Sequence, residues 1–337
     1  MLNAFRVARS RFRRGVLVLL YHRVAELCRD PWSLCVSPVR FEQHLAVVRD
    51  RTWPIRLQHI GPHLTAGTLR RPRVAVTFDD GYSDNLHQAE PLLRHAGIPA
   101  AIFVVSGALR WDREFWWDEL DRIVFESGPT GAPIKVKLKD ETFTWIVPDN
   151  SGTGGRDACQ AWTGNRPTAA HRAYAELHER LVRLRAAERT AILDEIVNQL
   201  ALPKSPRSTH RPLSRSEISA LASSPVIDIG VHTVTHPILA ELNRAEQTSE
   251  ISEAKAELES VTGRRLTLFS YPYGKREHYN DETMDIVRSS GFEYAFVNEP
   301  GIADEYADHL QMPRVVVPPL DGREFSAWLT HCLATLA

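Results

Sequence analysis

Two adjacent carboxylates, Asp79 and Asp80, end the apolar run of VAVTFDDGYSDN (residues 74–85) and are followed directly by Gly81. Two anions this close repel each other, so each raises the pKa of the other unless a positive group lies nearby. A divalent cation meets this need, because it neutralises one carboxylate and leaves the other available as a base. The structural alternative is that the two aspartates begin a turn and cap the helix that follows.

A second stretch, VIDIGVHTVTHP, places His232 and His236 four residues apart, just after another predicted strand. On a helical turn this spacing puts both imidazoles on one side, where they suit a single metal ion. The pattern also arises by chance, but here it stands at a strand end, as the aspartates do. One aspartate and two histidines supply three ligands and leave a fourth position for water, which is typical of catalytic sites.

A third stretch, FSYPYG (residues 269–274), predicts a strand that enters a tight turn. Pro272 stiffens this turn and Gly274 permits its backbone geometry. Such a turn can aim a backbone N–H at a developing oxyanion. An ordinary Pro-Tyr-Gly turn is the alternative.

In this order, TFDDG, HTVTH and YPYG resemble the three motifs of the polysaccharide deacetylase family, the NodB-homology domain of carbohydrate esterase family 4. The resemblance covers about residues 15–107 and 213–320. It implies an α/β fold, a distorted (β/α) barrel with fewer than eight strands, and one divalent metal ion, commonly zinc. It also implies an N-acetylated saccharide as substrate, with acetate and a free amino sugar as products.

The resemblance assigns a role to each matching residue. It makes Asp79 the general base, and it makes Asp80, His232 and His236 the metal ligands. The backbone amide of Tyr273 becomes an oxyanion donor. The metal then polarises the acetyl carbonyl and acidifies a water, from which the base removes a proton. Two alternatives stay open: a deacetylase or deformylase of a lipid-linked sugar, and a catalytically lapsed saccharide-binding protein.

The sequence departs from the family at two positions. Many members carry an arginine where Ser270 stands, and Arg314 in MPRVVV is the candidate that replaces it; a surface arginine at a strand start is the alternative. The family's acid is a histidine in a Leu-x-His motif, which LTH matches at His331, although in a predicted terminal helix. His309 and His22 compete with it, so the general acid is left unassigned.

Alternating strand and helix patterns must position these residues. Strands are predicted over 15–24, 73–80, 98–107, 226–232 and 266–274, with helices between them and short links. This alternation indicates parallel strands with right-handed crossovers. The carboxyl ends of such strands are where α/β folds assemble active sites.

Residues 108–212 break the alternation and are interpreted as a mostly helical insertion, with a hairpin over 134–147, into one catalytic domain over 1–337. Four aromatic residues begin this insertion. They either wall a sugar-binding groove or form a core, as aromatic stripes at helical spacing more often do. These residues are Trp111, Phe115, Trp116 and Trp117.

Composition sets broad limits. The 337 residues are 43% hydrophobic and 25% charged, with a formal net charge of -1, which gives no reason to expect nucleic acid as a partner. The four cysteines contain no C-x-x-C pair, which favours reduced thiols in a cytoplasmic protein. Residues 1–14 are predicted to be a solvated basic tail or a weak peripheral contact with an anionic membrane; the sequence predicts no signal peptide and no transmembrane segment.

Overall fold

The computed structural model describes residues 15–65, 71–127, 133–138, 141–146 and 169–336. The predicted basic tail over 1–14 and Cys159 lie outside these residues. Within them, no helix combines the length and the apolar character that a bilayer crossing requires. The three described cysteines, Cys28, Cys35 and Cys332, are free thiols, as expected.

Seven parallel strands follow one another in the order β11-β10-β9-β6-β5-β1-β12, and the two-residue strand β4 pairs with β5 beside this path. A parallel bridge between Phe296 and Met312 connects β11 with the segment that leads into β12, so the two ends of the sheet approach each other. The predicted α/β fold, a barrel-like sheet with fewer than eight strands, is therefore confirmed. The strands are β1 (Val16–Tyr21), β4 (Trp53–Pro54), β5 (Arg73–Phe78), β6 (Ala100–Val104), β9 (Ile227–Val231), β10 (Leu268–Ser270), β11 (Tyr294–Phe296) and β12 (Val315–Val316).

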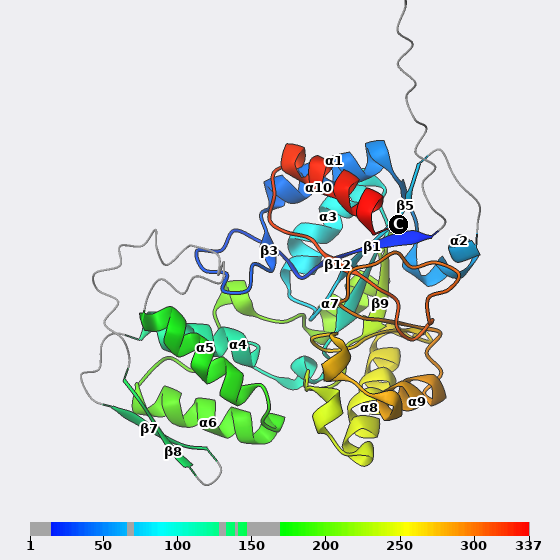
Figure 1. Cartoon of the computed structure of the whole chain (residues 1–337). Coiled ribbons are helices and arrows are strands. Elements are labelled where there is room, and N and C mark those ends of the chain that lie inside the picture. Colours follow the sequence, from blue (N-terminus) through cyan, green and yellow to red (C-terminus); the bar gives the residue numbers. More distant parts are fainter. Residues whose placement is uncertain (1–14, 66–70, 128–132, 139–140, 147–168, 337) are drawn as a thin grey trace, which may run out of the picture.

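Helices cover the outside of this sheet, with α1, α3 and α10 over one part and α8 and α9 over another (Figure 1). Strands β1, β5, β6 and β9 are buried along their whole length, as expected of parallel strands covered on both faces. The helices are α1 (Pro38–Arg51), α2 (Gly61–Thr65), α3 (Glu90–Ala96), α4 (Trp116–Glu126), α5 (Ala169–Leu181), α6 (Ala186–Gln199), α7 (Arg215–Ala222), α8 (Arg244–Thr262), α9 (Asp281–Ser289) and α10 (Gly322–Thr335).

Local signals in the sequence set several helix ends. Ser37 caps α1 by accepting a hydrogen bond from the backbone N–H of Arg40, and Ser214 and Asn243 begin capping boxes at α7 and α8. Gly263 ends α8 with a φ of 66°, which a residue without a Cβ adopts at no steric cost.

Helices α4, α5 and α6 lie together at one side of the barrel, next to the antiparallel hairpin of β7 (Ile134–Leu138) and β8 (Glu141–Trp145) (Figure 1). Tyr174, Leu177 and Ile196 belong to a hydrophobic cluster that these elements share. This stretch of chain thus has a core of its own, while its interpretation as an insertion over 108–212 stays a prediction.

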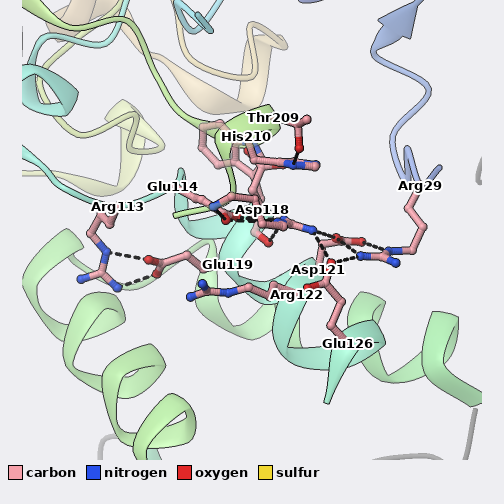
Figure 2. Close-up of polar contacts among 12 residues, drawn as sticks. Arg29, Arg113, Glu114, Asp118, Glu119, Asp121, Arg122, Glu126, Thr209 and His210 are labelled. Carbon is pink, nitrogen blue, oxygen red and sulfur yellow. Dashed lines mark hydrogen bonds and ion pairs between the residues drawn. The ribbon is translucent and has the colours of Figure 1, made fainter. Parts of the chain in front are cut away.

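Buried ion pairs fasten this group of helices to its surroundings. Arg207, on the chain that returns to the barrel, lies 2.7 Å from Glu114 and 2.8 Å from Asp121, and the Glu114 side chain is fully buried. Arg29 approaches the same Asp121 at 3.3 Å from the loop before β3 (Cys35–Val36). Figure 2 shows Arg29 pointing toward Asp121 and, nearby, Arg113 pointing toward Glu119.

Candidate active site

The two aspartates differ in backbone conformation where β5 ends. Asp79 continues the ladder, since its N–H donates to Tyr21 O at 3.1 Å, whereas Asp80 turns with a φ of 72° and Gly81 follows with a φ of 83°. Aspartate tolerates this left-handed conformation better than most residues. The capping alternative is wrong, because the next helical segment, Asn85–Ala89, has Asp84 at its N-cap.

Asp79 forms a bidentate ion pair with Arg314. Both guanidinium Nη atoms lie 2.7 Å from its carboxylate oxygens, and Ser270 Oγ donates to the same carboxylate at 3.1 Å. Although burial alone would raise the pKa of Asp79, the charge of Arg314 holds it well below its usual value. The surface alternative for Arg314 is wrong, because its side chain is fully buried.

His232 and His236 follow β9 in a loop, and the prediction that they lie on a helical turn is wrong. Thr233 and His236 have φ values of 64° and 56°, outside the right-handed helical region. Thr233 spans this loop, since its Oγ1 accepts the His236 N–H at 3.0 Å and its carbonyl accepts the N–H of Ser106 at 3.0 Å. The loop, not a helix, brings the two rings together.

Glu250 of α8 holds the middle of this loop from outside. Its carboxylate accepts hydrogen bonds from the N–H groups of Val234 and Thr235 at 2.9 and 2.8 Å, and from the Thr235 hydroxyl at 2.6 Å. These hydrogen bonds give partners to backbone N–H groups of the loop, which are not paired with a neighbouring strand. No pattern in the sequence singled out Glu250.

Asp80, His232 and His236 are buried, and each offers a ligand atom within 4.8 Å of the others. Asp80 Oδ1 lies 3.7 Å from His232 Nε2 and 3.5 Å from His236 Nε2. Burial lowers the pKa of both imidazoles, so both are neutral near pH 7. His232 Nδ1 lies 2.7 Å from the carbonyl of Ser270, which can only accept; Nδ1 therefore carries the proton and Nε2 the lone pair.

Two observations fit a metal ion at these three side chains. Burial and the charge of Asp79 raise the pKa of Asp80 well above its ordinary value, which is the situation that a nearby cation relieves. In addition, the bond from His232 to a backbone carbonyl is the support that metal-binding histidines usually have. A carboxylate with two imidazoles suits zinc.

The turn of the third motif lies beside the imidazoles. Tyr273 has a φ of 60°, and its ring packs on His236 with the centroids 4.6 Å apart. Asn298 fixes the turn, because its N–H donates to Gly274 O and its Nδ2 donates to Tyr273 O. Its Oδ1 also accepts from Arg314 at 2.7 Å, which connects the turn with the Asp79 ion pair. Asn298 lies two residues after β11, and its place near a strand end was the available signal in the sequence.

A cavity of about 640 Å³ joins these groups. Asp79, Asp80, both imidazoles of the second motif and Tyr273 all line it, whereas Arg314 lies behind Asp79. The structure thus brings the predicted site residues together. Further lining residues that the sequence did not single out are Trp32, His178, Lys275, His278 and Asn298.

Comparison with known proteins agrees with this geometry. The family profile described as polysaccharide deacetylase matches residues 66–128 and 201–295, which contain all three motifs. Over these two stretches the chain is similar to the polysaccharide deacetylase family. "Putative polysaccharide deacetylase YxkH" of Bacillus subtilis (strain 168) is 31% identical over 104 residues, which are 31% of this chain and 36% of that protein. The match therefore spans about a third of that relative.

Solved structures with the same fold cover nearly the whole chain. The Streptococcus pyogenes deacetylase PplD in complex with acetate has a TM-score of 0.58 at 15% identity, covering 95% of this chain and 98% of that one. IcaB from Ammonifex degensii has a TM-score of 0.56 at 18% identity, covering 94% and 97%. At these identities the likeness establishes the fold.

Of the three histidines considered as the general acid, one lines the cavity. His22, just after β1, is part of its wall. Burial, with a smaller contribution from Arg314, lowers the pKa of His22 to about 4, although Asp79 acts in the opposite direction. His309 and His331, both in the described part of the chain, are exposed and are not lining residues.

The aromatic residues at the start of α4 divide between core and cavity. Phe115 and Trp116 are buried in the cluster of the helical group, as the core interpretation predicts. Trp111 is partly buried and packs against the same cluster. Trp117 also lines the cavity, with its ring centroid 5.0 Å from that of His236. Its indole N–H donates to the hydroxyl of Tyr82 at 2.7 Å, and Tyr82 directly follows the first motif.

Proposed function

We propose that this chain is a metal-dependent hydrolase that removes N-acetyl groups from an amino-sugar-containing saccharide and releases acetate. The observation that carries the proposal is the buried group of Asp80, His232 and His236 beside an ionised Asp79, in one cavity. Similarity to the polysaccharide deacetylase profile, which includes all three motifs, supports the reaction class.

We assign the metal to Asp80, His232 and His236, with zinc as the ion that this set of ligands favours. When bound, the ion supplies Lewis-acid chemistry: it polarises a carbonyl and lowers the pKa of a water. Three protein ligands leave a coordination position open, as catalytic sites require.

We assign proton removal from the attacking water to Asp79. Arg314 keeps this carboxylate ionised and, with Ser270, orients it toward the cavity. The backbone N–H of Tyr273 is the proposed donor to the oxyanion that forms on the acetyl group. Its left-handed backbone, held through Asn298, supports this role because the donor is then in place before the substrate arrives.

The adjacent aspartates allow a matched test, since Asp79→Asn and Asp80→Asn make the same isosteric change at neighbouring buried positions. We expect both variants to lose at least about a hundredfold in acetate release, the lower range for loss of a general base. Asp79→Asn should retain one zinc per chain, whereas Asp80→Asn should not. Metal analysis after dialysis, together with an acetate assay on N-acetylglucosamine oligomers, measures both effects.

Two results would contradict the proposal. Full turnover by Asp79→Asn would remove its role as the base. Wild-type protein that takes up no transition metal, even in excess, would remove the metal site and with it the proposed reaction.

A further inference from the structure

A second pocket, of about 260 Å³, shares His236 and Trp117 with the cavity that the three motifs line. Its walls are largely aromatic, because the rings of Trp111, Phe115 and Trp116 also line it. The first turn of α6 forms another part of the wall. Apolar pockets with a few convergent polar groups are the usual form of a small-molecule site.

Arg189 brings a buried positive charge to this pocket. Its side chain is only 3% exposed, and its guanidinium lies over the ring of Trp116 at 4.7 Å. One Nη atom donates to the carbonyl of Thr235 at 3.2 Å. The other Nη atom is buried and meets no acceptor among the residues that the structure describes. A buried charged donor without an acceptor costs free energy, so this group favours a ligand that supplies one.

The carboxylates of the pocket are already paired. Glu114 and Glu119 line it, and each pairs with an arginine other than Arg189, at 2.7 and 2.9 Å. Glu250 raises the pKa of Arg189 from a distance, but burial has the larger effect and lowers it. Because the carboxylate of Glu250 accepts hydrogen bonds from the loop after β9, it does not serve as a direct partner of this guanidinium.

The first turn of α6 adds a second attraction for an anion. Ala186 and Ala187 begin this helix and line the pocket, and no side chain caps the turn. The first N–H groups of a helix have no partner within the helix, and the helix dipole makes this end positive. Glu188, the acidic residue of the turn, is not a lining residue of the pocket.

His236 offers a third donor. As a neutral ligand that binds the proposed metal through Nε2, its imidazole carries a proton on Nδ1. This Nδ1 is buried and has no partner in the described part of the chain, whereas Nδ1 of His232 has the carbonyl of Ser270. Metal-binding histidines usually donate this proton to a carboxylate, a carbonyl or a water.

We propose that the pocket bounded by Arg189, the first turn of α6 and His236 is a binding site for a small carboxylate with an apolar body. Guanidinium groups and helix N-termini both bind carboxylate oxygens. The aromatic walls favour a carboxylate that carries a hydrocarbon chain over phosphate, whose additional oxygens would lose their hydration there. The contribution of His236 rests on the proposed metal site, but those of Arg189 and α6 do not.

The test titrates acetate, propionate, butyrate and phosphate into the full chain at constant ionic strength and follows tryptophan fluorescence. We expect the Kd to fall by about fourfold for each added CH₂ group, as apolar surface is buried, and phosphate to bind more weakly than butyrate. Arg189→Gln should raise the Kd for butyrate by about tenfold or more. Arg189→Lys keeps the charge without the planar fork and should fall between the two. Circular dichroism checks that both variants fold.

The control, Arg172→Gln, removes an exposed arginine of α5 that does not line the pocket, and its Kd should equal that of wild type. Equal Kd values in Arg189→Gln and wild type, or phosphate bound as tightly as butyrate, would overturn the carboxylate site. Wild type that binds no carboxylate would overturn it as well.

Asp80→Asn separates this site from the proposed metal site. It should still bind butyrate, because Arg189 and α6 are unchanged; binding that disappears together with zinc would mean that the carboxylate binds the metal, and the inference would be wrong. Butyrate binding that depends on Arg189, in a protein that releases no acetate from N-acetylglucosamine oligomers, would support this site while the proposed function fails.

Discussion

Asp79 and Asp80 are neighbours in the chain, yet their surroundings give the two carboxylates opposite properties. Asp79 faces a buried arginine that keeps it ionised, while Asp80 faces two neutral imidazoles and the charge of Asp79. Two like groups separated in this way can take different roles in one reaction. The difference depends on Arg314, because its charge keeps the proposed base, Asp79, ionised.

At the residue scale, we predict that Arg314→Gln moves the acidic limb of the kcat/KM profile to higher pH. In wild type the pKa of Asp79 is far below neutral, so the group is ionised over the working range. Without Arg314, the largest influence opposing burial is removed, so this pKa rises. Because the ionised form is the active base, activity is then lost as pH falls through the raised value. Acetate release measured from pH 5 to 9 checks this.

Arg323→Gln is the control for this prediction, since it removes an exposed arginine from α10. Its profile should overlay that of wild type. An acidic limb in Arg314→Gln that also overlays wild type, at whatever rate, would mean that the arginine does not govern the base.

At the scale of elements, the loop after β9 brings the two histidines proposed as metal ligands together without a helix. Its two histidines point to one place because Thr233 closes the turn and Glu250 of α8 holds the N–H groups between them. Helix α8 therefore supports the proposed ligands although it contributes none. Such outer partners commonly change metal affinity by about ten- to a hundredfold.

We predict that Glu250→Gln weakens zinc binding by about tenfold and leaves the fold intact. An amide can accept with one oxygen only, so one of the hydrogen bonds from the loop is lost. Competition with a chromophoric zinc chelator measures the affinity, and circular dichroism checks the fold. Glu253→Gln makes the same change on the exposed side of α8 and should bind zinc as wild type does. Equal affinity in both variants would refute the supporting role of Glu250.

At the scale of the whole molecule, the barrel and the group of α4, α5 and α6 share one cavity. The barrel supplies the proposed ligands and base, and the helical group supplies Trp117 and His178 to the wall. Their relative position depends on buried ion pairs centred on Arg207. Removing one member of such a pair leaves an uncompensated buried charge, which costs roughly 3–5 kcal/mol.

We predict that Arg207→Gln lowers the free energy of unfolding by an amount near this range, because Glu114 then stays buried without its partner. Urea unfolding followed by tryptophan fluorescence measures the change. Arg288→Gln is the control: its pair with Asp285 is exposed, and such pairs contribute about 0–1 kcal/mol. A loss in Arg207→Gln no larger than that in the control would show that the buried pairs do not hold the helical group.

Short stretches of sequence determined the strands, several helix ends and the positions of the three motifs. Buried parallel strands appear in the sequence as continuous apolar runs such as VLVLLY. Helix ends follow from residues such as Ser214 and Gly263. Both signals are readable because they depend on residues that are close together in the chain. The positions of the aspartates, the histidines and the YPYG turn at strand ends followed from the same reasoning.

Tertiary structure alone decided which distant groups meet. Arg314 reaches Asp79 across 235 residues of chain, and Trp32 reaches Tyr174 across 142. The sequence admitted Arg314 as one of two alternatives and suggested no partner for Trp32. The helical turn expected at His232 and His236 was wrong because hydrogen bonds that Thr233 and Glu250 accept from this loop outweigh the local spacing pattern. Local propensity acts over a few residues, whereas packing and buried charge choose among the contacts that the folded chain makes available.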